Sequence, residues 1–233
     1  MKMQITKLIF SRVTISLLLI LGACSNNEHE DYSHEHHEDM SHASSLEEEN
    51  HSEMEREKSI HKEHDAIQDK FAHQDIIILD IPYQLEKAEK EKFQQIIEAY
   101  LNMKNLLVVD DLEKIDNSIS VMKEKVNSVS WQLFKDGGKK AWKQHAELYN
   151  TKLDEMAHVE GLEEKRSYFN HISEIVYCSI KSFDLADEQK LYTAFCPMAF
   201  NGKGAYWISE TKEIKNPYFG KMMLTCGNIK EKL

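Results

Sequence analysis

The chain has 233 residues, of which 41% are hydrophobic and 30% charged, and its formal net charge is −11. A protein this acidic lacks the basic face that nucleic-acid binding needs, so we expect no nucleic-acid partner. The acidity is uneven: residues 28–65 hold 14 acidic and 3 basic residues, whereas residues 66–233 carry a net charge of only −3.

The first 23 residues have the pattern of a bacterial lipoprotein signal peptide. Lys2, Lys7 and Arg12 precede an apolar run of 9 residues, which is too short to span a bilayer as a helix. The run ends in "LGAC", which resembles a lipobox and implies cleavage before Cys24 and acylation of that cysteine. An ordinary secretory signal is the alternative. The serine after Cys24 is similar to that of outer-membrane lipoproteins, so we expect a lipid-anchored protein of the cell envelope that faces the periplasm or the cell surface.

Residues 24–82 are predicted to be a disordered linker. Few of them are large and apolar, and 9 of the 12 histidines of the chain fall between residues 29 and 73. A spacer that lifts the body off the membrane would have no need of so much histidine. We therefore expect a secondary, loose metal site in this tail, suited to Cu(II), Zn(II) or Ni(II). Its candidate ligands are His34, His36, His37 and His42.

Residues 83–233 are predicted to form one all-α domain. Apolar residues recur with a helical period from about residue 85, as a heptad seam over 112–129, after a "DGG" turn at 136–138, and again up to Phe183. Asp110 or Asp111 is a candidate helix N-cap, and Gly161 precedes another acidic helix start. Four helices with short connections favour an antiparallel four-helix bundle.

Two polar residues on these helices are interpreted as structural. His145 flanks an aromatic stripe, and we expect it to be a boundary histidine with a hydrogen-bond partner. Cys178 shares a flank with His171, but seven helical residues separate them by about 10.5 Å, too far for one ion. We interpret Cys178 as a free cysteine that packs as a small hydrophobic residue.

The last segment, residues 184–233, is predicted to be an irregular loop packed on the bundle. It holds four of the eight glycines and two of the three prolines. Its sulfur residues form two groups, "CPM" at 196–198 and "MMLTCG" at 222–227. Thiolates and thioethers together are soft ligands that favour Cu(I). The candidate copper ligands are Cys196, Met198, Met223 and Cys226.

Two alternatives to a copper site remain open on the sequence. A disulfide between Cys196 and Cys226 would close a loop of about 30 residues, worth roughly 3–4 kcal/mol in the chain-entropy model. The methionines could instead fill the core beneath the loop. No CxxC pair occurs, so this is not a zinc pattern.

The C-terminal segment resembles the bacterial domain of unknown function 3347 family over roughly residues 92–231. The runs that recur in the family are, in this sequence, "CPMA" at 196–199, "GAYW" at 204–207, "NPYFG" at 216–220, "ML" at 223–224 and "CG" at 226–227. In the helical part the similar positions are Tyr100, Leu101, Leu107, Val108, Arg166, Phe169 and Ser173. Related domains occur with periplasmic adaptors of heavy-metal efflux pumps and with copper-handling proteins, so the resemblance implies copper handling.

We therefore expect a membrane-tethered metal-binding lipoprotein that holds Cu(I) for efflux or sequestration. Its expected partners are the membrane, through Cys24, and a heavy-metal efflux adaptor or copper chaperone. The alternative is a disulfide-stapled helical interaction module that docks on such an adaptor and binds no metal. We expect no enzyme activity, because the sequence has no nucleophile elbow, phosphate loop or HExxH motif.

Overall fold

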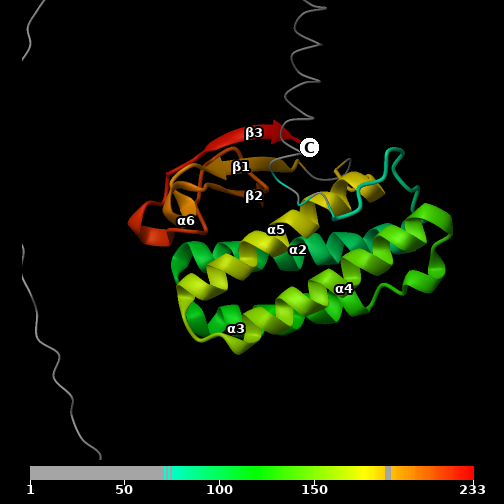
Figure 1. Cartoon of the computed structure of the whole chain (residues 1–233), viewed down its shortest axis with the longest axis horizontal. Coiled ribbons are helices and arrows are strands. Elements are labelled where there is room, and N and C mark those ends of the chain that lie inside the picture. Colours follow the sequence, from blue (N-terminus) through cyan, green and yellow to red (C-terminus); the bar gives the residue numbers. More distant parts are fainter. Residues whose placement is uncertain (1–70, 72, 74, 187–189) are drawn as a thin grey trace, which may run out of the picture. The chain divides into compact units, whose positions relative to one another are not determined.

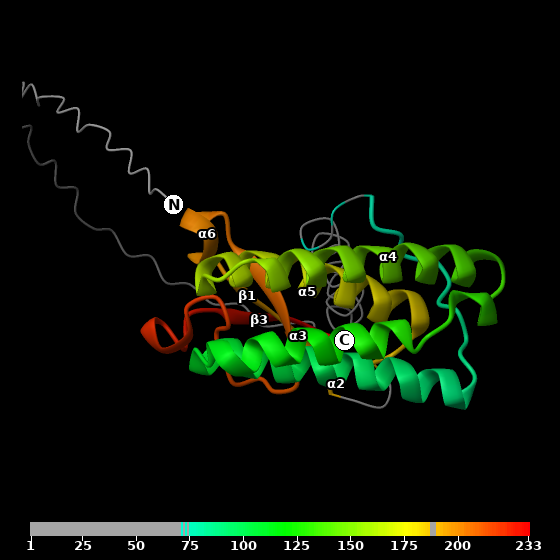
Figure 2. The same cartoon turned by 90° about the horizontal axis from the view of Figure 1, so that it is seen from below.

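The computed structural model of the protein describes residues 71, 73, 75–186 and 190–233. Within them the chain is mostly helical, with the long helices α2 (Lys87–Val109), α3 (Leu112–Asn127), α4 (Asp136–His158) and α5 (Leu162–Phe183). A short 3-10 helix, η1 (Trp131–Leu133), lies between α3 and α4. Along the chain, α2 packs on α3, α3 on α4 and α4 on α5 (Figures 1 and 2). The predicted helical body is thereby confirmed.

The helix ends follow the local chemistry of the sequence. Asp111 is the N-cap of α3, and its side chain accepts a hydrogen bond of 3.2 Å from the Lys114 backbone amide. Asp110 instead ends α2 in the left-handed conformation, with a φ of 59°. Gly161 is the N-cap of α5, as its acidic neighbours indicated.

The predicted "DGG" turn is wrong, because residues 136–138 form the first turn of α4. Gly138 is there for space rather than for a turn: a Cβ atom at this position would lie 2.2 Å from Cδ2 of Tyr83. The glycine lets the segment before α2 cross close to the start of α4. The sequence pattern predicts a turn at these glycines, whereas the close contact with Tyr83 is what requires a glycine at position 138.

Most residues of the predicted apolar stripes form the core, but Leu112, the first residue of the predicted heptad seam, is 39% exposed. Phe93 on α2, Trp142 on α4 and Phe183 on α5 are almost completely buried, and the rings of Phe93 and Trp142 meet with centroids 4.6 Å apart. The indole nitrogen of Trp142 donates to the Val129 carbonyl oxygen at 2.8 Å, so its burial leaves no polar atom unpaired.

The C-terminal segment was expected to be irregular, and the structure corrects this. It contains a three-stranded antiparallel sheet of order β2-β1-β3. The strands are β1 (Tyr192–Cys196), β2 (Ala205–Ser209) and β3 (Asn228–Lys232). A four-residue helix, α6 (Ala199–Gly202), and a 3-10 helix, η2 (Gly220–Met222), lie in the connections. The sheet lies on one side of the helices, with β2 against α5 (Figure 1).

The strands could not be predicted from the sequence because they are short and largely buried. Each has only five residues, and four of the five in β1 and in β2 are buried. Strands covered on both faces do not alternate between apolar and polar residues, so no period of two is visible.

The predicted linker ends at residue 82, but its last part contacts the helical body. The Ile77 amide donates to Gln144 Oε1 of α4 at 2.8 Å, and the Tyr83 amide to the Ser182 carbonyl oxygen of α5 at 2.8 Å. Phe71 is also buried, only 3% exposed. The packed part of the chain thus extends to the N-terminal side of residue 83.

Candidate functional site

Two of the predicted sulfur ligands meet at one end of the sheet. The Sγ atoms of Cys196 and Cys226 lie 2.9 Å apart. Cys196 is buried and Cys226 is partly exposed, and both are free thiols. The neighbouring Cys196 thiol and burial raise the pKa of Cys226, so this group is a neutral thiol at pH 7.

Strand pairing explains why two cysteines 30 residues apart in sequence come together. Cys196 is the last residue of β1, and Phe195 pairs with Asn228 of β3. In this antiparallel register the chain before β3 runs directly beside the end of β1. Cys226 therefore approaches Cys196 from the loop, while Cys196 is fixed in the central strand.

Asn216 holds the loop that carries Cys226. The residue is completely buried, and its side-chain amide donates to the Cys226 carbonyl oxygen at 2.7 Å. Its side-chain oxygen accepts from the backbone amides of Tyr218 and Phe219, at 2.8 and 3.2 Å. The first residue of the "NPYFG" run is thus the centre of a turn that positions one thiol.

A glycine is required at position 227 because the loop before β3 passes very close to β1 and β2 there. Its φ is +140°, and a Cβ atom would lie 2.9 Å from the Phe195 carbonyl oxygen and 2.9 Å from the Trp207 ring. A larger residue would push the loop away from β1 and separate the two thiols.

Three of the other family-like positions, Arg166, Tyr100 and Ser173, join the helices to the C-terminal segment. Arg166 of α5 donates to the Pro217 carbonyl oxygen at 2.8 Å and to Asp110 Oδ1 at 2.6 Å. Tyr100 of α2 bonds Ser173 of α5 at 2.8 Å and accepts from the Ile208 amide of β2 at 3.0 Å. These residues are scaffold contacts that fix the sheet on the helices.

The two methionines predicted as ligands line a groove beside the thiols. Its volume is about 790 Å³, and the exposed fractions of Met198 and Met223 are 56% and 38%. Met222, Phe200 and Phe219 also line it, but neither cysteine does. The structure therefore brings the two thiols together and places the thioethers on an adjoining open surface.

Cys178 has the surroundings expected of it, whereas His145 has the expected hydrogen-bond partners but lies inside the core rather than at its boundary. His145 is buried, and its Nε2 and Nδ1 atoms lie 2.7 Å from the Ile77 carbonyl oxygen and 3.1 Å from Ser179 Oγ. Burial lowers the pKa of His145 to about 4. Cys178 is a completely buried free thiol whose pKa is raised by burial.

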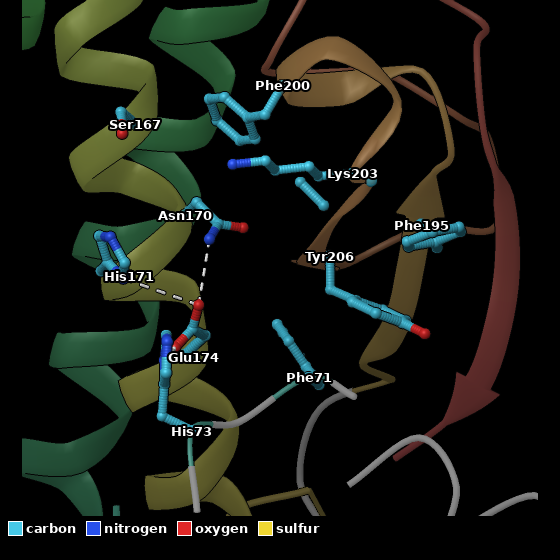
Figure 3. Close-up of a pocket in the computed structure, with 12 residues that line it drawn as sticks. Phe71, His73, Ser167, Asn170, His171, Glu174, Phe195, Phe200, Lys203 and Tyr206 are labelled. Atoms are coloured by element: carbon cyan, nitrogen blue, oxygen red, sulfur yellow. Dashed lines mark hydrogen bonds and ion pairs between the residues drawn. The ribbon is translucent and has the colours of Figure 1, made fainter. Parts of the chain in front are cut away.

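The sequence analysis missed a second group of ligand-type side chains (Figure 3). His73, His171 and Glu174 offer ligand atoms that all lie within 4.8 Å of one another. His73 Nδ1 is 2.5 Å from Glu174 Oε2, and His171 Nδ1 is 3.7 Å from Glu174 Oε1. The spacing of His171 and Glu174 on one helix was the available clue. His73 lies in the predicted linker, where nothing in the sequence indicates a contact with α5.

This group borders a cavity of about 660 Å³. Phe71 and Tyr206 face it across the cavity, and the amine of Lys203, beside Phe200, points toward Asn170 of α5 (Figure 3). Burial raises the pKa of Glu174 and lowers the pKa of His171, since both charged forms lose water.

The predicted signal peptide, Cys24 and the tail histidines lie outside the described residues. Among the residues that are described, no helix is both long enough and apolar enough to cross a membrane.

One family comparison gives a match. Residues 96–188 match the family described as "Protein of unknown function (DUF3347)". The matched region covers most of α2, then α3, α4 and α5, and it ends before Cys196, the first of the predicted sulfur ligands. Comparison with curated proteins and with solved structures gave no match.

Proposed function

Since residues 96–188 match the family described as "Protein of unknown function (DUF3347)", a description that names no function, we propose a function from the geometry of the site. The chain is a metal-binding lipoprotein of the bacterial cell envelope, and Cys196 and Cys226 bind Cu(I). It catalyses no reaction. Its four long helices, arranged as an antiparallel bundle, are the rigid support for this site.

The observation that carries the proposal is the thiol pair. Two thiols 2.9 Å apart, one fixed in a central strand and one on a loop, offer two soft donors to one ion. In a tetrahedral site with metal–sulfur bonds of about 2.3 Å, two thiolates lie about 3.8 Å apart. The loop would have to move by roughly 1 Å, which the partly exposed Cys226 permits.

Binding at this pair would release protons. The thiolate is the ligand form, and the pKa of Cys226 is raised by its neighbour. We therefore expect Cu(I) affinity to increase with pH through the neutral range.

The methionines would act as the entrance to the site. Met198 and Met223 are exposed thioethers on the groove beside the thiols, and they lie close in sequence to Cys196 and Cys226. In the proposal they receive Cu(I) and exchange it with a partner, a heavy-metal efflux adaptor or a copper chaperone. The tail histidines His34, His36, His37 and His42 collect ions loosely, and acylated Cys24 holds the chain at the membrane.

The test is a Cu(I) titration of the reduced, acyl-free chain against a chromophoric chelator. Three variants are compared with it: a deletion of the tail up to residue 69, Cys196→Ser with Cys226→Ser, and Cys178→Ala. The deletion ends before Phe71 because that residue packs in the core.

We expect one tight Cu(I) equivalent in the intact, tail-deleted and Cys178→Ala chains and none in the double serine variant. Cys178→Ala is the matched control, since it removes the third thiol of the described residues. Tight binding that survives in the double serine variant would show that the copper ligands are elsewhere.

The 2.9 Å separation also favours a second candidate function, a disulfide-stapled interaction module. It is shorter than the spacing of two thiolates on one ion, and only a small approach is needed for a bond. The docking surface would then be the exposed apolar cluster of Met198, Met222, Met223 and Leu224.

Intact mass separates the two functions. A mass 2 Da below that of the reduced chain, together with no Cu(I) uptake after reduction, would exclude metal binding by the thiol pair. Cu(I) uptake by the reduced chain that is lost in the double serine variant would exclude the module that binds no metal.

A further inference from the structure

We propose that His73, His171 and Glu174 form a second metal site, for a divalent ion of the Zn(II) class. The three residues offer two imidazole nitrogens and one carboxylate oxygen within 4.8 Å of one another. This site lies on α5 and on the segment before α2, and none of its ligands is a sulfur atom. It does not rest on the proposed function of the thiol pair.

The ligand set matches the chemistry of borderline divalent ions. Imidazole and carboxylate suit Zn(II), and two histidines with one glutamate is a ligand set of catalytic zinc sites. Cu(I) prefers thiolate and thioether donors, which lie at the end of the sheet. The two sites would therefore select different ions.

The carboxylate is already oriented by a supporting hydrogen bond. Glu174 is only 5% exposed, and its Oε1 atom accepts from the Asn170 side-chain amide at 3.0 Å. Tyr218 Oη in turn lies 3.4 Å from the side-chain oxygen of Asn170. Metal-binding carboxylates are commonly held by such outer contacts, which fix their direction.

An ion would replace the direct contact between His73 and Glu174. The two atoms are 2.5 Å apart, whereas two ligands on a tetrahedral ion with bonds of about 2.0–2.1 Å lie about 3.3 Å apart. The required movement is small, and His73 can make it because its side chain is 62% exposed. His171 is half-buried and needs to approach only slightly.

The fourth coordination position would open to the cavity. Within the described parts of the chain the group contains three ligand residues, and a cavity of about 660 Å³ borders all three. Phe71, Lys203 and Tyr206 line the opposite side (Figure 3). Three protein ligands with one open position leave room for water or an anionic ligand on the ion.

The ion would tie two distant parts of the fold together. His73 and Glu174 are 101 residues apart, and Phe71 beside them packs on the Tyr177 and Tyr206 rings with centroids 4.6 and 4.9 Å away. A ligand that binds only this folded arrangement stabilises the folded state. Tail histidines that bind the ion equally in both states leave the melting temperature unchanged.

The test measures the melting temperature of the full acyl-free chain, reduced, with and without buffered free Zn(II). At free Zn(II) about 100 times the dissociation constant, we expect a rise of about 5–10 °C. His73→Ala, His171→Ala and Glu174→Gln should each weaken binding by at least about 10-fold and reduce the rise by about half or more. His73→Ala and Glu174→Gln are the safest for folding, since one side chain is exposed and the other substitution keeps its shape.

His158→Ala is the matched control, because it removes an exposed histidine at the end of α4. It should keep the full rise, as should Cys196→Ser with Cys226→Ser. The proposal is overturned if Zn(II) does not stabilise the unaltered chain. It is also overturned if the rise persists in the three cluster variants, or if it is lost only with the thiols.

Discussion

The thiol pair and the His73–His171–Glu174 cluster show two different ways of bringing ligand-type side chains together. The thiols are 30 residues apart, and adjacent strands of one small sheet join them. His73 and Glu174 are 101 residues apart, and they meet only because the segment before α2 folds back on α5. The thiol pair can therefore be recognised from sequence motifs within one segment, whereas the His73–His171–Glu174 cluster has almost no sequence signature.

The two regions also differ in the ions that they suit. One offers soft sulfur atoms beside an open groove, and the other offers imidazole and carboxylate beside a separate cavity. In the two proposals, the sites would therefore hold ions of different class without competing for them.

The largest expected effect is a crossed loss of metal response. Cys196→Ser with Cys226→Ser should abolish tight Cu(I) binding and leave the Zn(II)-dependent melting temperature unchanged. Glu174→Gln should leave tight Cu(I) binding unchanged and reduce the Zn(II)-dependent rise in melting temperature by about half or more. Chelator competition and thermal melts on the same samples measure both, and loss of both responses in either variant would contradict the separation of the sites.

A second effect comes from the residue that positions Cys226. Asn216→Ala would leave the buried amides of Tyr218 and Phe219 without their acceptor, at a cost of about 3 kcal/mol in the free energy of unfolding. Urea unfolding measures this, with Asn102→Ala on the exposed face of α2 as a control expected within about 0.5 kcal/mol of the unaltered chain. Cu(I) affinity should also fall for Asn216→Ala, whereas the Zn(II) response should remain.

A third expectation distinguishes a structural histidine from a metal-binding one. His145 has a folded-state pKa of about 4 against an ordinary value of 6.5. Above pH 6.5 His145 is neutral in both the folded and the unfolded state, so its protonation does not change the stability there. As the pH falls towards 4, only the unfolded state gains the proton, so stability decreases by about 2 kcal/mol at pH 5 and about 3 kcal/mol in total.

Urea unfolding at pH 7 and pH 5, without added metal, measures this decrease. His145→Gln should lose most of the difference between the two pH values, whatever its stability at pH 7. An unchanged difference would assign the acid sensitivity to other groups.

The smallest expected effect concerns the groove. Met198→Leu and Met223→Leu keep the apolar volume but remove the thioethers, and each should weaken Cu(I) binding by less than about 10-fold, because the thiols remain. Met222→Leu is the matched control, since Met222 lines the same groove and is 75% exposed. An equal effect in all three variants would indicate a change in packing rather than the loss of a ligand.

The helices could be predicted because their apolar period is long and regular. The seam from Ile115 to Val129 is buried, and Asp111 caps α3 through its own side chain. The strands could not be predicted in this way, because five residues covered on both faces show no alternation. Gly138 was misassigned to a turn for a related reason, since its neighbour Tyr83 lies far away in the sequence.

By itself, the sequence determined the helical body, the acidic histidine-rich tail and the pair of cysteines as candidate ligands, because each depends on composition or on contacts between near neighbours in the chain. Only the tertiary structure decided that Cys196 and Cys226 are adjacent while Met198 and Met223 line a separate groove, and that His73 meets Glu174. Those relations depend on how strands pair and how a distant segment packs on α5. Neither the hydrophobic period nor the motif spacing contains that information.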